Sequence, residues 1–187
     1  PAQTGPGMSE ADTLHAQGVL LAEQGDLTGA LVLFDQALEL EPDNAGFWND
    51  KGVIHNALGQ YREGLAATER TTVLEPDAAI GWNTKAAALL GLERYAEALI
   101  AAEKATSLDP DYANAWVNKG AALLILERYE EGLAAAEKAL ALDPNDAVAW
   151  NNKAYALINL GRLPEALTAA EVATTADPNY AMAWNNK

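Results

Sequence analysis

The sequence predicts an all-α protein built from repeated helical hairpins. Five prolines follow one another at a constant spacing of 34 residues, and five tryptophans and five lysines keep the same spacing. Apolar and small residues between them recur at helical intervals, and no stretch alternates as a strand would. A constant spacing along most of the chain indicates an array of repeats, because a single globular domain does not require it.

The repeat is defined by placing each proline at position 32 of a 34-residue sequence unit. The prolines are Pro42, Pro76, Pro110, Pro144 and Pro178; the tryptophans, at position 4, are Trp48, Trp82, Trp116, Trp150 and Trp184. Complete repeats then cover 11–44, 45–78, 79–112, 113–146 and 147–180. Residues 1–10 form an N-terminal tail, of which Pro1–Gly7 is expected to be a cloning remnant, and residues 181–187 begin a sixth repeat.

The first helix of each repeat is expected to begin after the proline. Proline cannot continue the preceding helix, and the Asp or Asn that usually follows it can cap the next one. In the third repeat, Trp82, Ala86 and Leu89 then recur at helical spacing. A break follows near the middle of each repeat, and the residues there are Gly25, Gly59 and Gly161 or the pairs Glu93–Arg94 and Glu127–Arg128.

The second helix of each repeat is predicted from a further periodic stretch, such as Tyr95, Ala98 and Ala102. Pro164 falls in the first turn of its helix, where a missing N–H is tolerated. Positions 8 and 20 of the repeat hold only Gly or Ala. Since glycine inside a helix costs about 1 kcal/mol relative to alanine, its repeated use indicates that the helices approach closely there.

This pattern of Trp, Gly, Tyr, Ala and Pro at fixed offsets resembles the tetratricopeptide repeat over residues 11–180. The resemblance implies an α-solenoid in which antiparallel helix pairs stack into a right-handed superhelix with a concave, peptide-binding groove. The sequence departs from the family pattern at position 7 (Gln17, then lysine), at position 11 (leucine or His55) and at position 24 (Phe34, Thr68, then alanine). The interior is therefore expected to be thin, with the tryptophans supplying much of its bulk.

The composition narrows the possible functions. Twelve Lys and Arg against 27 Asp and Glu give a net charge of −15, which disfavours nucleic acids and anionic membranes as partners. The chain has no cysteine, no apolar run of membrane-spanning length and no recognisable signal peptide, so we expect a cytoplasmic protein without metal, cofactor or membrane insertion. His15 is expected to face the groove and His55 to be a core substitution. An open groove rarely provides the closed pocket that acid–base catalysis needs, so we expect no enzyme activity.

The candidate binding residues come from the resemblance, which implies that positions 2, 5, 6, 9, 12 and 13 line the groove. Asparagine recurs at positions 5 and 6, and its amide can donate to and accept from a peptide backbone. We predict an asparagine ladder with apolar neighbours, made of Asn49, Asn83, Asn118, Asn151, Asn152, Leu124 and Tyr155. The alternative is that these asparagines are solvated near the helix start. Positions 2, 9 and 13 hold no Lys or Arg for a carboxylate clamp, so a chaperone C-terminus is not expected.

The lysines at position 7 form a second row. Each follows an acidic residue by sixteen positions, and the pairs are Asp35–Lys51, Glu69–Lys85, Glu103–Lys119, Glu137–Lys153 and Glu171–Lys187. If the second helix of one repeat packs on the first helix of the next, these residues can form ion pairs worth about 0.2–1 kcal/mol each. Independent surface charges are the alternative.

The sequence thus predicts a protein-interaction scaffold that binds an extended, basic or neutral peptide. Two alternatives stay open: a self-assembling spacer that stacks end to end, and a recruiting arm of a larger protein or enzyme. Residues 1–50 hold nine acidic residues and no Lys or Arg, which favours a basic partner or simply solubility. The incomplete sixth repeat leads us to expect that the native chain continues or that its open end meets another copy in a homo-oligomer.

Overall fold

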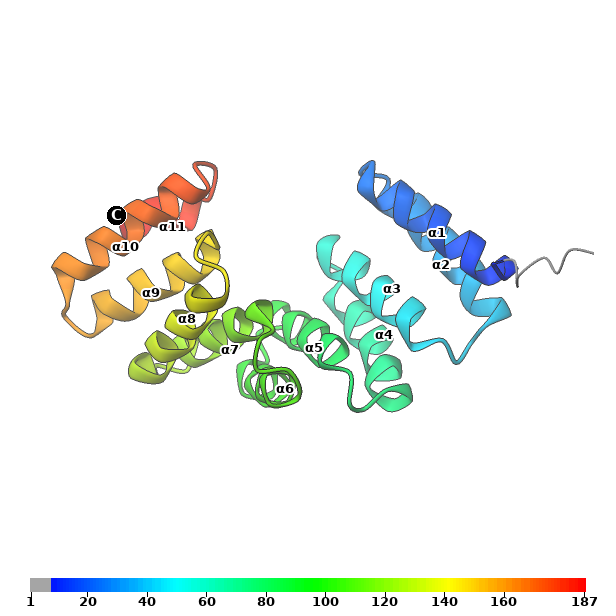
Figure 1. The fold of residues 1–187 in the computed structure, drawn as a ribbon, viewed down its shortest axis with the longest axis horizontal. Helices are drawn as coiled ribbons and strands as arrows, with labels where there is room; N and C mark the ends of the chain where they lie inside the picture. Colours follow the sequence, from blue (N-terminus) through cyan, green and yellow to red (C-terminus); the bar gives the residue numbers. More distant parts are fainter. Residues whose placement is uncertain (1–7) are drawn as a thin grey trace, which may run out of the picture. The chain divides into compact units, whose positions relative to one another are not determined.

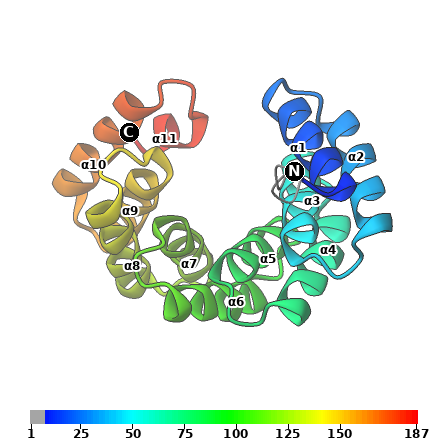
Figure 2. The ribbon, with the colours of Figure 1, turned by 45° about the vertical axis from the view of Figure 1, so that its right-hand side comes forward.

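The computed structural model describes residues 8–187, which form eleven α-helices and no strand (Figure 1). The expected cloning remnant Pro1–Gly7 lies outside the described residues. The chain divides into two compact units, Pro1–Asp77 and Ala78–Lys187, which we call the N-terminal unit and the C-terminal unit. The predicted all-α fold of helical hairpins is confirmed, and Figure 2 shows the paired helices of each unit.

The helices of each unit follow in chain order, two to a hairpin. The N-terminal unit contains α1 (Glu10–Glu23), α2 (Leu27–Leu40), α3 (Ala45–Ala57) and α4 (Tyr61–Leu74). The C-terminal unit contains α5 (Ala79–Gly91), α6 (Tyr95–Leu108), α7 (Ala113–Ile125), α8 (Tyr129–Leu142), α9 (Ala147–Asn159), α10 (Leu163–Ala176) and α11 (Ala181–Asn186). Within the C-terminal unit the first helices α5, α7, α9 and α11 also contact one another in sequence order.

The break inside each hairpin is a left-handed residue at position 15. Gly25, Gly59 and Gly161 have φ between 71° and 87°, and Glu93 and Glu127 have φ of 59° and 60°. A residue in the left-handed conformation ends the first helix, while its backbone N–H still donates a hydrogen bond to a carbonyl of that helix. The Glu–Arg pairs therefore take the same turn as the glycines, although a side chain is less favourable in this conformation.

The second helices of the C-terminal unit begin with a short ion pair. Arg128 precedes α8 and holds Glu131 through two hydrogen bonds of 2.7 and 2.6 Å, and Arg162 holds Glu165 in the same way at the start of α10. These hydrogen bonds keep the pKa of the Glu131 and Glu165 carboxyls below their ordinary value. A carboxylate in the first turn also suits the positive end of the helix dipole.

The core is built largely from alanine. The largest fully buried side chains are Phe34, Leu123, Leu157, Thr68 and Thr71, and most other core residues are alanines. The Thr68 hydroxyl is satisfied because it donates to the carbonyls of Gly64 and Leu65, both at 3.0 Å. Small side chains let the backbones approach closely, so the expectation of a thin interior holds.

Positions 8 and 24 are complementary in size. A Cβ added to Gly18 would lie 2.6 Å from the Phe34 ring, and one added to Gly52 would lie 2.7 Å from the Thr68 methyl group. Where position 24 is alanine, position 8 can be alanine as well, as in the buried residues Ala86 and Ala154. The steric demand inferred from the sequence is therefore real at Gly18 and Gly52.

The tryptophans lie at the edge of the core. Trp48, Trp116 and Trp150 pack against clusters of buried residues, as expected, but they and Trp82 are only half-buried, and Trp184 is 52% exposed. The indole N–H donates to the carbonyl of the proline six residues earlier, at 2.8 Å from Trp48 to Pro42 and from Trp150 to Pro144. This bond, which Trp116 and Trp184 also make, connects the turn before the helix to the helix itself. An indole N–H needs a polar partner when it leaves water, and this partner lies at the surface edge of the hairpin.

Three of the position-7 lysines make the predicted ion pairs. The Nζ atom of Lys51 lies 2.5 Å from the Asp35 carboxylate. The Nζ of Lys119 lies 3.7 Å from Glu103, and the Nζ of Lys153 lies 3.0 Å from Glu137. The other two pairs stay predictions. All five lysines also lie 5.2–5.6 Å from the ring centroid of the tryptophan three residues earlier. The lysine head group therefore interacts with an indole on its own helix and, in these three pairs, with a carboxylate on the preceding helix.

We predict that Gly120→Ala stabilises the protein by up to about 1 kcal/mol, because the glycine penalty in the helix is removed. The added Cβ would lie 3.6 Å from the Ala135 Cβ, an ordinary contact. Urea denaturation followed by circular dichroism measures the shift. Gly52→Ala is the control and should lower the midpoint, because its Cβ would clash with Thr68. A lower midpoint for Gly120→Ala would contradict the packing described above.

We also predict that Glu137 and Lys153 are energetically coupled. A double-mutant cycle with Glu137→Ala and Lys153→Ala should give a coupling free energy of about 0.2–1 kcal/mol that decreases with added salt. The matched control is a cycle between Glu137 and Lys119, whose ion-pair partner is Glu103 rather than Glu137. If the two substitutions had additive effects on stability, Glu137 and Lys153 would be independent surface charges and the prediction would be wrong.

Candidate functional site

Hydrogen bonds join position 5 of one repeat to position 6 of the next. The Asn118 Nδ2 donates to Asn83 Oδ1 at 2.8 Å, and the Asn186 Nδ2 donates to Asn151 Oδ1 at 2.8 Å. In the N-terminal unit the same two positions bring His15 Nε2 to 2.8 Å from Asp50 Oδ2. Each bond joins residues 35 positions apart and therefore connects two neighbouring first helices; we call this hydrogen bond the staple.

Where position 5 is valine, the backbone replaces the missing amide. The Asn152 Nδ2 donates to the carbonyl oxygen of Val117 at 3.3 Å. The staple between α7 and α9 is therefore kept although Val117 has no polar side chain.

The predicted asparagines are mostly inside the protein. Asn49, Asn83, Asn151 and Asn152 are buried, with Asn151 only 3% exposed, and Asn118 is half-buried. The alternative of solvated asparagines is therefore wrong for these four. Asn83 also donates to the Tyr112 hydroxyl at 3.2 Å, and burial is the main reason that the pKa of Tyr112 is raised. Much of the hydrogen-bonding capacity of these amides is used within the protein.

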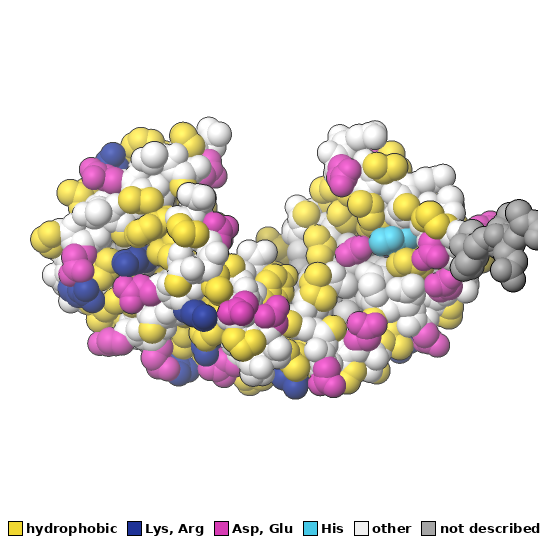
Figure 3. Space-filling model, in the orientation of Figure 1, with side chains coloured by type: hydrophobic (Ala, Val, Ile, Leu, Met, Phe, Trp, Pro, Cys, Tyr) yellow, Lys and Arg dark blue, Asp and Glu magenta, His cyan; other side chains and the backbone are white. Residues whose placement is uncertain are grey.

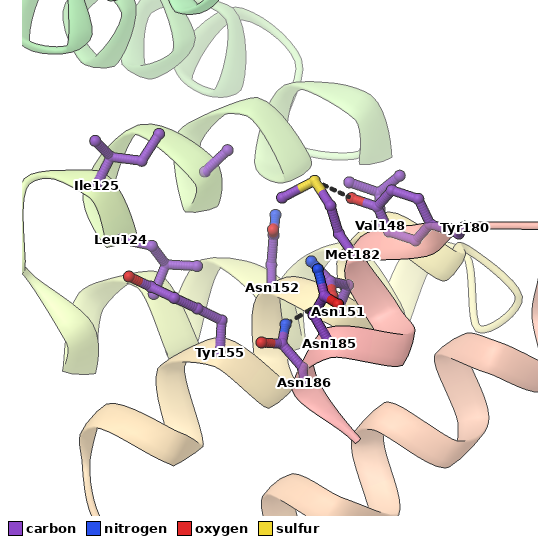
Figure 4. A pocket seen from close by; sticks show the side chains of 11 residues that line it. Leu124, Ile125, Val148, Asn151, Asn152, Tyr155, Tyr180, Met182, Asn185 and Asn186 are labelled. Atoms are coloured by element: carbon purple, nitrogen blue, oxygen red, sulfur yellow. Dashed lines mark hydrogen bonds between the residues drawn. The ribbon is translucent and has the colours of Figure 1, made fainter.

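A pocket of about 410 Å³ lies in the C-terminal unit, on the first helices α7, α9 and α11 (Figure 4). The lining residues are Ala121, Leu124, Ile125, Val148, Asn151, Asn152, Tyr155, Tyr180, Met182, Asn185 and Asn186. We call it the C-terminal pocket. None of these lining residues carries a charge.

The C-terminal pocket has two apolar sides and an amide centre. Figure 4 places Leu124, Ile125 and Tyr155 on one side and Val148, Tyr180 and Met182 on the other, with the asparagines between them. The Tyr180 hydroxyl lies 3.7 Å from the Met182 sulfur, and partial burial raises the pKa of Tyr180. The pocket thus presents apolar surface on both sides of a narrow polar strip.

The C-terminal pocket gathers four of the predicted residues, namely Leu124, Asn151, Asn152 and Tyr155. Asn83 and Asn118 bond to each other on α5 and α7, and Asn49 lies on α3 of the N-terminal unit.

Sequence reasoning missed Ile125, Val148 and Met182, which are 49%, 39% and 58% exposed. They occupy positions 2 and 13, which the resemblance places in the groove but from which no binding residue was predicted. Their apolar character was the signal that could have found them.

The two histidines have different surroundings. His15 stacks on Phe34 and Phe47, with ring centroids 5.1 and 4.4 Å away. His55 is half-buried and lies 2.7 Å from the Gln60 side chain in an exposed contact, so its expected role as a core substitution is wrong.

Residues 8–187 contain neither a cluster of metal ligands nor a helix suited to cross a membrane. No group of three or more His, Asp or Glu side chains in this range could hold a metal ion. None of its helices combines the length and the apolar character that crossing a membrane requires.

Comparison with protein families identifies the repeat. Models described as tetratricopeptide repeat match residues 21–88, 79–112, 113–146 and 135–168. No curated protein sequence matches the chain.

Solved structures with the same fold are numerous. A crystal structure of MamA has a TM-score of 0.73 at 19% identity and covers 94% of this chain and 99% of its own. TTC0263, a thermophilic TPR protein of Thermus thermophilus, has a TM-score of 0.77 at 22% identity, covering 94% and 95%. YrrB, titled a TPR protein with an unusual peptide-binding site, has a TM-score of 0.69 at 22% identity, covering 94% and 91%. At these identities the likeness concerns the fold.

We predict that Asn151→Ala lowers the free energy of unfolding by about 1–2 kcal/mol without any ligand, because the Asn186 amide loses its buried acceptor. Urea denaturation measures the loss. Asn185→Ala is the control: Asn185 is exposed, and exposed substitutions usually change stability by less than about 0.5 kcal/mol. Equal, small effects of the two substitutions would show that the staple contributes nothing.

Proposed function

Because the chain belongs to the tetratricopeptide repeat family, we propose that it is a protein-interaction scaffold that binds an extended peptide segment along its first helices. The observation that carries this proposal is the uncharged C-terminal pocket of about 410 Å³ on α7, α9 and α11. The proposed role is binding without catalysis.

The exposed apolar side chains of the C-terminal pocket support a peptide ligand. Single exposed hydrophobic residues are ordinary, but several that converge on one pocket mark a binding site. Ile125, Val148, Tyr155 and Met182 are all exposed there. Burying one medium-sized apolar ligand side chain among them would contribute about 1.5–3 kcal/mol.

The amides have two proposed roles. Asn83, Asn118 and Asn151 hold the first helices in register, so they act on the ligand by positioning the walls of the groove, and Asn49 has the smaller role of holding the Asp50 carboxylate. Asn152 keeps further donor and acceptor capacity beyond its bond to Val117, and Asn185 is exposed beside it in the pocket. These two amides are proposed to contact the peptide backbone, with Leu124 and Tyr155 contacting a side chain.

The net charge of the protein determines which charge a bound peptide can carry. The chain carries a net charge of −15, so an acidic segment would be repelled and a neutral or basic one accepted. Ordering an extended peptide offsets much of the contact energy, and we expect a dissociation constant of about 1 μM. The fold shared with YrrB, which is described as having an unusual peptide-binding site, supports a peptide as the ligand class.

Self-association is the second candidate function. Leu163, Leu167 and Trp184 are exposed on α10 and α11, and together they offer apolar surface outside the C-terminal pocket. Light scattering over a range of protein concentrations separates the two functions: a mass that rises with concentration favours assembly, and a constant monomer mass favours peptide binding alone.

We predict that Ile125→Ser combined with Val148→Ser weakens peptide binding about tenfold or more, because two apolar contacts are lost. The measurement is binding to an array of short peptides from the protein's own proteome, followed by fluorescence polarisation with the best peptide. Ile100→Ser is the control, since Ile100 is exposed on α6 of the same unit but does not line the C-terminal pocket. Binding that survives the double substitution would move the site elsewhere.

A further inference from the structure

A second pocket, of about 320 Å³, lies in the N-terminal unit. Its lining includes Val19, Glu23, Phe34, Asp50, Val53 and Ile54, and we call it the N-terminal pocket. It combines an apolar wall with two carboxylates, which the C-terminal pocket lacks.

The two pockets occupy the same place in the repeat. Positions 9 and 13 of one repeat and positions 6 and 9 of the next line both of them. In chain order these are Val19, Glu23, Asp50 and Val53 in the N-terminal pocket, and Ala121, Ile125, Asn152 and Tyr155 in the C-terminal pocket. All four positions differ, and two of the replacements change the charge: Glu23 stands where the C-terminal pocket has Ile125, and Asp50 stands where it has Asn152.

The two carboxylates are held differently. Asp50 is fixed by His15 Nε2 at 2.8 Å and by the Asn49 Nδ2, which donates at 3.3 Å, so one side of the pocket is preorganised. Glu23 is the last residue of α1 and is exposed, and no hydrogen bond or ion pair joins its side chain to another of the described residues. Its side chain can therefore turn towards a ligand without breaking an internal contact.

The surrounding charge favours a cation. The N-terminal unit has 13 Asp and Glu against three Lys and Arg, and no Lys or Arg precedes Lys51. On the face drawn in Figure 3 most of the visible Lys and Arg side chains lie over the C-terminal unit. A cationic group that entered the N-terminal pocket would meet an attractive field with little competition from nearby cations.

We propose that the N-terminal pocket binds an arginine side chain of the partner's segment. The aliphatic stem lies on Val19 and Val53, above the buried Phe34, and the guanidinium lies between Glu23 and Asp50. Arginine suits the pocket better than lysine because its planar, weakly hydrated head pairs with carboxylates through two hydrogen bonds and packs on apolar and aromatic surface. This inference rests on the proposed function, since it assigns a second contact to the same kind of peptide.

The test uses the full chain with labelled Ile, Leu, Val and Met methyl groups and three capped tripeptides, in which Arg, Glu or Leu is flanked by Gly. The Arg tripeptide should shift the methyl signals of Val19, Val53 and Ile54, whereas the Glu tripeptide should not. Glu23→Gln should weaken the Arg tripeptide about two- to fivefold, as expected for a partly exposed ion pair. The effect should fade as salt rises, because exposed charges are then screened.

A gain-of-function variant completes the test. Ile125→Glu places a carboxylate at the equivalent position of the C-terminal pocket, at an exposed site that tolerates a polar side chain. This variant should make the Val148 and Met182 methyl signals respond to the Arg tripeptide more strongly than in the wild type. If the Arg tripeptide leaves the N-terminal methyl signals unchanged, or binds equally well after Glu23→Gln, the inference is wrong.

The Leu tripeptide separates this inference from the proposed function. It should shift the signals of Ile125, Val148 and Met182. If it does so while the Arg tripeptide fails at the N-terminal pocket, only the arginine subsite is refuted. If the Arg tripeptide behaves as expected and the Leu tripeptide does not bind, the arginine subsite stands and the apolar site of the proposed function is wrong.

Discussion

The hydrogen bond between position 5 of one repeat and position 6 of the next is the interaction on which the candidate sites depend. It is made by Asn83 with Asn118, by Asn151 with Asn186 and by His15 with Asp50. A buried amide that loses its partner is costly, whereas a satisfied one fixes a geometry. The bond therefore sets the spacing between neighbouring first helices, and that spacing defines the width of the pockets between them.

A second set of contacts orders the edge of each hairpin. The indole of Trp150 is bonded to the Pro144 carbonyl, and Lys153 lies between that indole and Glu137. None of these contacts is strong, because all are partly exposed. Their repetition at the same positions gives each turn, first helix and preceding second helix one preferred arrangement, which suits a core made mainly of alanine.

The fold could be predicted from the sequence because the same pattern of residues occurs in every repeat. The 34-residue spacing indicated the hairpins, and the sixteen-residue offset indicated the pairs Asp35–Lys51, Glu103–Lys119 and Glu137–Lys153. The burial of the asparagines could not be predicted, because it depends on the distance between two helices, which a single helix pattern does not contain. The apolar role of Val148 and Met182 was missed for a similar reason, since each is an isolated residue until α7, α9 and α11 lie together.

The repeated tryptophan environment has a consequence for spectroscopy. All five indoles have a lysine ammonium over the ring, and four of them are seen to donate to a proline carbonyl, so their surroundings are similar apart from the greater exposure of Trp184. No tryptophan lines either of the two proposed pockets. Intrinsic fluorescence should therefore change when a hairpin edge opens and stay constant when a peptide binds. It measures whether the hairpins are folded and does not measure whether a pocket is occupied.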